Sequence, residues 1–171
     1  MNRDRRNFIG QVLFGGSALI MSPTTLLTQK TSRSEPYSQK LIKEFVVAGH
    51  NNLDKVKTML ADYPNLLNCT WDWGGGDFEM AIGGAGHVGN KEIANHLIGV
   101  GARVNLFVLT MLGKTNIVKP MLEEYPNLIY AKGPHGFTML HHAKQGGDAA
   151  LELYEYLQSK GLTKTKVSLT G

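Results

Sequence analysis

A glycine-rich run at residues 83–89, GGAGHVG, is the first stretch whose spacing could do chemistry. Gly84, Gly86 and Gly89 spell G-x-G-x-x-G between an extended-looking stretch and a helical-looking one, which is typical of a loop that holds the pyrophosphate of a dinucleotide. Such a site also needs an acidic residue about 20 positions further on for the ribose. Residues 93–122 contain neither Asp nor Glu. The sequence therefore argues against a nucleotide site, and we expect no cofactor.

The same glycines are unusual for a helix. Gly83, Gly84 and Gly86 fall where the sequence predicts a helix, and each costs about 1 kcal/mol there relative to alanine. Two explanations remain open: a neighbouring helix packs closely against this backbone, or a ligand approaches it.

Residues 71–79, WDWGGGDFE, place two tryptophans and three acidic side chains immediately before the glycine run. Tryptophan is enriched at interface hot spots, and loops often carry binding residues. The triple glycine allows the tryptophans either to project toward a partner or to fold back over the core. We predict a partner-binding site made of Trp71, Asp72, Trp73, Asp77, Phe78, Glu79 and His87.

A second function is compatible with the same stretch. Clustered carboxylates can act in acid–base chemistry or bind a cation. The alternative prediction is a small-ligand-binding protein or an enzyme whose pocket, near residues 71–87, is formed by Gly83–His87 with Asp72, Asp77 and Glu79.

The histidines and the cysteine form no local metal or nucleophile motif. His141 and His142 are adjacent, so on a helix they point about 100° apart, and His87 and His96 are nine positions apart. One cysteine, Cys69, excludes an intramolecular disulfide and every cysteine-based zinc module. We expect no metal and no catalytic residue.

The charge distribution bears on partners. The 171 residues have a formal net charge of +4, but five of the 18 Lys and Arg and only one of the 14 Asp and Glu lie in residues 1–34. The remainder carries 13 of each, so no basic surface for a phosphate backbone is expected. We predict a monomer that binds a protein and no nucleic acid.

The basic N-terminus has the features of an export signal. Residues 5–9, RRNFI, contain Arg5 and Arg6, one further residue, and then the apolar Phe8 and Ile9. This motif resembles the twin-arginine export signal, although the residues on either side depart from that family's usual Ser/Thr and Lys. The resemblance implies that the Tat translocase is a partner during export, and that the protein folds before it crosses the membrane and works in the periplasm or outside. Without a functional leader the protein would be cytoplasmic.

An apolar run comes after the arginines. Residues 12–21 are too few for a membrane span, which needs about 20, but they suit the core of a signal peptide. No clear cleavage site lies beyond them, so an uncleaved N-terminal anchor is the one membrane attachment that stays open.

The remainder of the chain repeats. KTMLADYPNLLN at 57–68 is nearly the same as KPMLEEYPNLIY at 119–130. Between and after them, AGHVGNKEI with HLIGVGARVN (residues 85–105) and GFTMLHHA (residues 136–143) carry patterns that resemble those of the ankyrin repeat family. Each copy has an apolar stripe at helical spacing that it cannot bury alone, so the copies are expected to stack.

The resemblance implies an all-α fold, an ankyrin-repeat solenoid of about four helix–turn–helix repeats with short or irregular finger loops. The predicted organisation is an export signal and linker at 1–34, repeats at about 38–70, 71–105, 106–132 and 133–162 within a domain at 35–162, and a polar tail at 163–171. The predicted function is that of an exported ankyrin-repeat protein that mediates protein–protein binding in the cell envelope and has no catalysis of its own.

Overall fold

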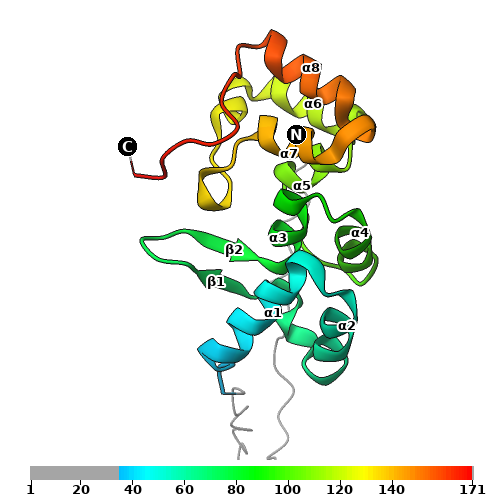
Figure 1. Cartoon of the computed structure of the whole chain (residues 1–171), viewed down its shortest axis with the longest axis vertical. Coiled ribbons are helices and arrows are strands. Elements are labelled where there is room, and N and C mark those ends of the chain that lie inside the picture. Colours follow the sequence, from blue (N-terminus) through cyan, green and yellow to red (C-terminus); the bar gives the residue numbers. More distant parts are fainter. Residues whose placement is uncertain (1–34, 171) are drawn as a thin grey trace, which may run out of the picture. The chain divides into compact units, whose positions relative to one another are not determined.

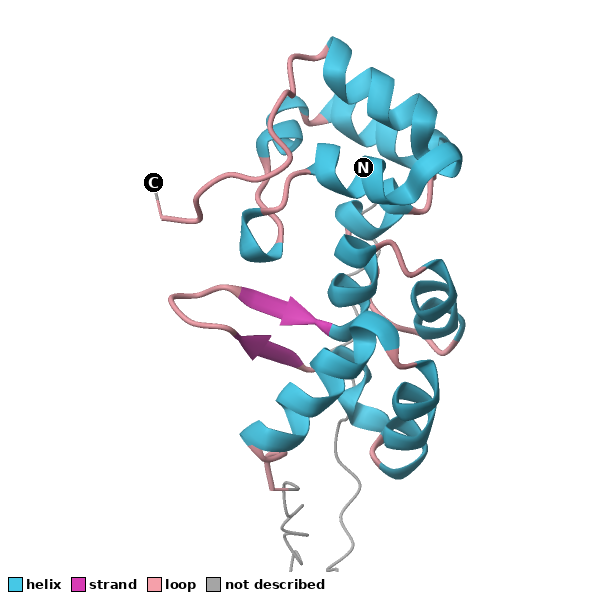
Figure 2. Cartoon of the chain, in the orientation of Figure 1, coloured by secondary structure: helices cyan, strands magenta, loops and turns pink. Residues whose placement is uncertain are grey.

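A computed structural model describes residues 35–170. This part of the chain is mostly helical, as predicted, with one small antiparallel hairpin (Figure 2). The α-helices are α1 (Gln39–Asn51), α2 (Leu53–Asp62), α3 (Ala81–Val88), α4 (Lys91–Gly99), α5 (Leu106–Met111), α6 (Thr115–Glu124), α7 (Met139–Gly146) and α8 (Leu151–Ser159). The strands are β1 (Thr70–Asp72) and β2 (Phe78–Met80), and the 3₁₀ helices are η1 (Pro64–Asn68), η2 (Pro126–Tyr130), η3 (Pro134–Gly136) and η4 (Gly147–Ala150).

The predicted export residues Arg5, Arg6, Phe8 and Ile9 lie outside the described residues. Within residues 35–170, no helix is both long enough and apolar enough to cross a lipid bilayer.

Polar side chains fix where several helices begin. The side chains of Asn52, Asn90 and Asn105 accept hydrogen bonds from backbone N–H groups in the first turns of α2, α4 and α5. Such caps satisfy donors that have no partner within the helix. The connection between α4 and α5 consists of residues 100–105 and is shorter than those before α3 and α7.

The helices pack in consecutive pairs, α1 with α2, α3 with α4, α5 with α6 and α7 with α8. The first helix of each pair also contacts the first helix of the next, in the order α1, α3, α5, α7 (Figure 1). The buried side chains form two apolar clusters. One extends from Phe45 to Met111 and the other from Val118 to Leu162.

The glycine run lies in α3, between neighbouring helices. A Cβ on Gly86 would lie 3.0 Å from Cγ2 of Val108 on α5, closer than ordinary van der Waals contact. Gly89 ends α3 with a left-handed φ of 76°, a conformation that favours glycine. Close helix packing is therefore the explanation for Gly86.

The connection before α3 is the hairpin, and its tip is a glycine turn. Thr70 pairs with Met80, and Trp71 pairs with Glu79. Gly74, Gly75 and Gly76 all have positive φ. In Figures 1 and 2 the hairpin stands out beside α1 and α3, and β2 runs directly into α3.

The C-terminal segment is attached to the start of the last helical pair. The backbone N–H of Thr138 donates to the carbonyl of Thr165 at 3.1 Å, and that of Val167 donates to the carbonyl of Gly136 at 2.9 Å. This segment, predicted as a polar tail, therefore lies along residues 136–138.

Candidate metal centre

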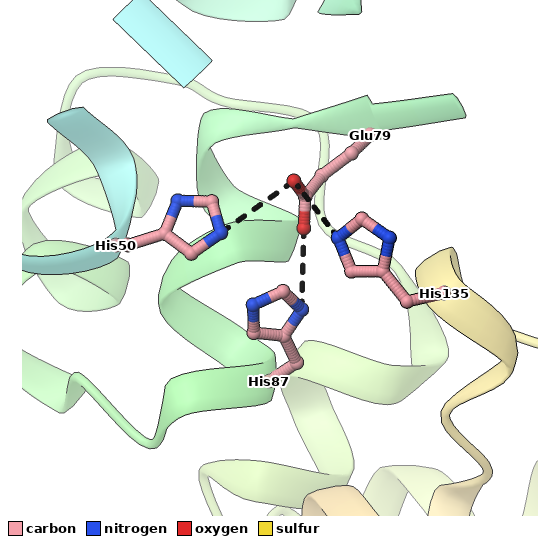
Figure 3. A group of neighbouring side chains, drawn as sticks. All are labelled: His50, Glu79, His87 and His135. Atoms are coloured by element: carbon pink, nitrogen blue, oxygen red, sulfur yellow. Dashed lines mark ion pairs between the residues drawn. The ribbon is translucent and has the colours of Figure 1, made fainter. Parts of the chain in front are cut away.

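Four side chains from four different elements converge beside the hairpin: His50, Glu79, His87 and His135 (Figure 3). Each offers one ligand atom, and the four atoms all lie within 4.8 Å of one another. None of the four is adjacent to another in sequence, so the helices and the hairpin must create the group.

His50 lies in the last turn of α1. Its Nδ1 donates to the carbonyl of Val46, one turn earlier in the same helix, at 3.0 Å. This bond leaves the lone pair of Nε2 facing Oε2 of Glu79, at 3.6 Å. A Cβ on Gly84 would lie 2.7 Å from the His50 ring. The imidazole therefore occupies space that the glycine run leaves open.

Glu79 lies on β2, and the alternation of side chains along a strand separates it from its neighbours Phe78 and Met80. Its side chain is completely buried. The indole N–H of Trp73 donates to Oε2 at 2.9 Å, whereas Oε1 has no hydrogen-bond partner. Burial raises the pKa of the Glu79 carboxyl, and the nearby His50 opposes that shift.

His87 lies near the end of α3, and its side chain is buried. Its Nδ1 is 3.2 Å from Oε1 of Glu79, and both atoms are buried without a hydrogen-bond partner. Burial lowers the pKa of His87 to about 3, with further lowering from the neighbouring His50 and His135. The ring is therefore neutral at neutral pH, which is the form that binds metals.

His135 is held in an unusual backbone conformation within η3. Its φ of 59° is positive, which is uncommon for a residue other than glycine. Asp77 accepts from its backbone N–H at 2.8 Å and from its ring Nδ1 at 2.7 Å. The ring Nε2 is thereby directed at Oε2 of Glu79, at 3.6 Å. Local strain of this kind is often found at functional sites.

The spacing of the donor atoms fits a four-coordinate ion. In tetrahedral zinc sites the bonds to histidine nitrogen and carboxylate oxygen are about 2.0–2.1 Å, so neighbouring ligand atoms lie about 3.3 Å apart. The nitrogen–oxygen separations are 3.6 Å from His50 and from His135 to Oε2 of Glu79, and 3.2 Å from His87 to Oε1. They are close to that edge length, and the two at 3.6 Å are too long for hydrogen bonds. Because they reach both carboxylate oxygens, and the four ligand atoms spread over up to 4.8 Å, small side-chain movements would bring the donors onto one ion.

The surroundings also resemble those of known metal ligands. Metal-bound histidines usually donate their second ring N–H to a backbone carbonyl or a carboxylate, which fixes the tautomer. Val46 provides that carbonyl for His50, and Asp77 provides that carboxylate for His135. When the three imidazoles are neutral, their nitrogen lone pairs and the buried carboxylate repel each other, and a cation bound between them would remove this repulsion.

The structure divides the residues predicted to bind a partner. Glu79 and His87 are buried in the group, and Asp77 orients His135, so these three do not form an exposed surface. Trp73 folds back to donate to Glu79, although 37% of it remains exposed.

The other predicted partner-binding residues lie outside the group. Asp72 accepts from the backbone N–H groups of Gly74 and Gly76 and so stabilises the hairpin turn. Trp71 lies 5.4 Å from Nζ of Lys43, and Phe78 is 60% exposed. The alternative prediction placed Asp72, Asp77 and Glu79 in one pocket. Asp77 and Glu79 both contact His135, whereas Asp72 faces the hairpin turn.

The sequence interpretation missed His50 and His135 and expected no metal. It considered histidine pairs that were close in sequence, whereas successive members of the group are 29, 8 and 48 positions apart. Five of the six histidines gather in this part of the fold, since His141 donates to the carbonyl of His87 and His142 lies beside it. The clustering arises from tertiary packing, so no local spacing could reveal it.

Comparisons with known proteins do not assign this site. No family model matches the chain, and no curated protein has significant sequence similarity to it.

Proposed function

We propose that this protein binds one transition-metal ion, of which zinc(II) is the best fit, through His50, Glu79, His87 and His135. The observation that carries the proposal is the convergence of these four donors around two buried atoms, Oε1 of Glu79 and Nδ1 of His87, that have no hydrogen-bond partner. Buried polar atoms are rarely left without partners, and a bound cation would provide one for both.

The donor set favours this class of metal. Three imidazoles and one carboxylate suit Zn²⁺ and its neighbours, whereas Ca²⁺ and Mg²⁺ prefer sites made entirely of oxygen. Sulfur does not contribute, because Cys69 lies outside the group and its Sγ donates to the carbonyl of Asn65. Such an ion can hold segments of the chain together or act as a Lewis acid.

Calorimetric titration of the metal-free full chain with zinc chloride tests the proposal. We expect one ion per chain, with binding weakened at least about 100-fold by His50→Ala and by Glu79→Gln. His135→Asn provides a further test, because asparagine tolerates the left-handed backbone at this position and keeps the turn intact. His96→Ala is the matched control, since His96 lies outside the group. Equal zinc binding by all four variants would exclude the site.

We further propose that the scaffold is an ankyrin-like stack of about four repeats, as the sequence resemblance implies. Support comes from the four consecutive helix pairs and from the contacts that link α1, α3, α5 and α7 in order. The hairpin then corresponds to an irregular finger loop at the start of the second predicted repeat, 71–105.

Protein binding, in a cell envelope reached by twin-arginine export, is the second candidate function. The observation that favours it is the exposure of Phe78 (60%) and Trp73 (37%) on the projecting hairpin. An affinity pull-down with Phe78→Ala and Trp73→Ala tests it. If both variants retain every partner of the wild-type protein, the hairpin is not the binding surface.

A further inference from the structure

The four proposed ligands belong to parts of the fold that are held with different strength. His50 and His87 lie on α1 and α3, which pack against each other around the buried Phe45 and Ile82. Glu79 lies on the hairpin, and His135 lies on the short turn η3. An ion bound by all four would connect two peripheral segments to two helices of the core.

Apart from the centre, the hairpin is attached through contacts of both strands with α1 and of β2 with α3. Each strand has only three residues, and a two-stranded hairpin of this size is marginally stable by itself. On its inner side, Nζ of Lys43 on α1 lies 5.4 Å from the ring of Trp71 and 5.6 Å from that of Trp73. At the tip, a Cβ added to Gly74 or Gly75 would have no neighbouring atom within 4 Å, so no other described segment packs against these two residues there.

Without a cation, the closed arrangement is unfavourable at its centre. The side chain of Glu79 is fully buried, and among residues 35–170 its only hydrogen bond comes from Trp73, which belongs to the same hairpin. The nitrogens of three imidazoles face this carboxylate at 3.2–3.6 Å. Opening of the hairpin would return the carboxylate to water, so the empty centre favours an open hairpin and the filled centre a closed one.

We propose that metal binding closes the hairpin and the η3 turn onto α1 and α3, so that occupancy of the centre regulates the exposure of Trp71 and Trp73. This inference rests on the metal centre proposed above and adds a role for it. Asp77 makes the two segments move together, because it belongs to the hairpin and holds both the backbone and the ring of His135.

Hydrogen–deuterium exchange of the full chain, with and without zinc chloride, tests the proposal directly. Two amides serve as indirect reporters, because a hairpin released from the helices is only marginally stable and its hydrogen bonds open more often. Trp73 N–H donates to the carbonyl of Asp77 at 2.9 Å, and His135 N–H donates to the Asp77 carboxylate at 2.8 Å. We expect zinc to slow exchange at least about tenfold in peptides that cover 72–79 and 133–137. Peptides from α6 and α8 should change little, because they lie outside the centre.

A neutral variant separates closure from metal binding. Glu79→Gln keeps an oxygen that can accept from the Trp73 indole N–H but removes the buried charge. In the absence of metal, its hairpin should exchange more slowly than that of the wild-type protein, and zinc should have no effect on it. Circular dichroism checks that the variant is folded.

The outcomes distinguish this inference from the proposed function. If calorimetry shows no zinc binding, the metal centre itself is wrong. If zinc binds but hairpin exchange is unchanged, or slows equally throughout the chain, the centre stands and the regulation of the hairpin is refuted. Equal exchange of the metal-free Glu79→Gln and wild-type hairpins would also contradict it.

Discussion

The segments 57–68 and 119–130 are closely similar in sequence and fold in the same way, but the connections after them differ. Each segment ends a helix, α2 or α6, and continues into a 3₁₀ turn that begins with proline. After the first comes the hairpin with Asp77 and Glu79, and after the second comes the turn with His135. The repeated segments therefore form scaffold, while the connections that do not repeat supply two of the four proposed ligands, Glu79 and His135, and the orienting Asp77.

The two kinds of region are stabilised by different forces. The scaffold buries apolar side chains, which is favourable wherever the surfaces fit. The candidate site buries a carboxylate and three imidazoles, which is unfavourable until a cation compensates. Changes in the scaffold should therefore affect folding and leave metal affinity intact, and changes at the site should do the reverse.

The largest effect on stability is expected from a scaffold residue far from the centre. Leu157 on α8 is fully buried in the C-terminal apolar cluster. Leu157→Ala should lower the free energy of unfolding by about 2–5 kcal/mol, because it removes apolar contacts and leaves a cavity. Urea denaturation in the presence of EDTA measures this change. Zinc affinity of the folded variant should stay within about twofold of wild type, and a parallel loss of affinity would abolish the distinction between the two regions.

A buried histidine of the scaffold should respond to pH differently from a metal ligand. Burial lowers the pKa of His142 to about 4 from an ordinary value of about 6.5. The hydrogen bond from its Nδ1 to the carbonyl of Thr138 acts in the opposite direction but is the weaker effect. Between these values the unfolded chain binds the proton more readily, so stability falls as pH falls from 6.5 toward 4.

The expected loss due to His142 is about 2 kcal/mol between pH 7 and pH 5, and about 3 kcal/mol by pH 4. Urea denaturation in EDTA should show a steeper fall for the wild-type protein than for His142→Leu, which cannot take up the proton. Other groups titrate in both proteins, so the difference between the two slopes isolates this residue. Parallel slopes would mean that His142 is not buried in its neutral form.

At the site, the residue that orients a ligand should affect affinity more than folding. Asp77→Asn removes the charged acceptor for the His135 ring, and loss of such an orienting partner typically weakens metal binding about 10- to 100-fold. Asp72→Asn is the matched control on the same hairpin, because its side chain still accepts from the turn. Calorimetry with zinc chloride compares the two, and equal affinities would show that Asp77 does not support the centre.

The scaffold was largely readable from the sequence because its signals are local. Gly89, Gly113 and Gly147 have positive φ and end or follow α3, α5 and α7. The corresponding residue of the first pair, Asn51, has no positive φ and is the last residue of α1. Cap residues such as Asn105 are also a local signal, because its side chain accepts a hydrogen bond in the first turn of α5.

The site was only partly readable because it depends on contacts between segments distant in sequence. The stretch 71–87 was identified through its tryptophans, acids and glycines, and it does contribute Glu79 and His87. Its residues were expected on a surface because tryptophan is enriched at interface hot spots, but Glu79 is buried and needs partners from elsewhere in the fold. Those partners, His50 and His135, become neighbours only after the helices have packed.

The smallest effects are expected when Gly84, beside the site, and Gly99, in the scaffold, are each replaced by alanine. The comparison of these two variants gives the sharpest contrast between the two regions. A Cβ on Gly84 would lie 2.7 Å from the His50 ring, whereas at Gly99, the last residue of α4, nothing lies within 4 Å. Gly99→Ala should raise the free energy of unfolding by about 0.5–1 kcal/mol through helix propensity and leave zinc affinity unchanged.

Gly84→Ala gains the same propensity but must displace the imidazole, which is 21% exposed and can rotate toward solvent. Folding should therefore be retained while zinc affinity falls about tenfold, equivalent to about 1.4 kcal/mol. Urea denaturation in EDTA and calorimetry with zinc chloride measure the two quantities on the same samples. If Gly84→Ala binds zinc as tightly as Gly99→Ala does, then the glycine run serves helix packing alone, and the space beside His50 is not part of the centre.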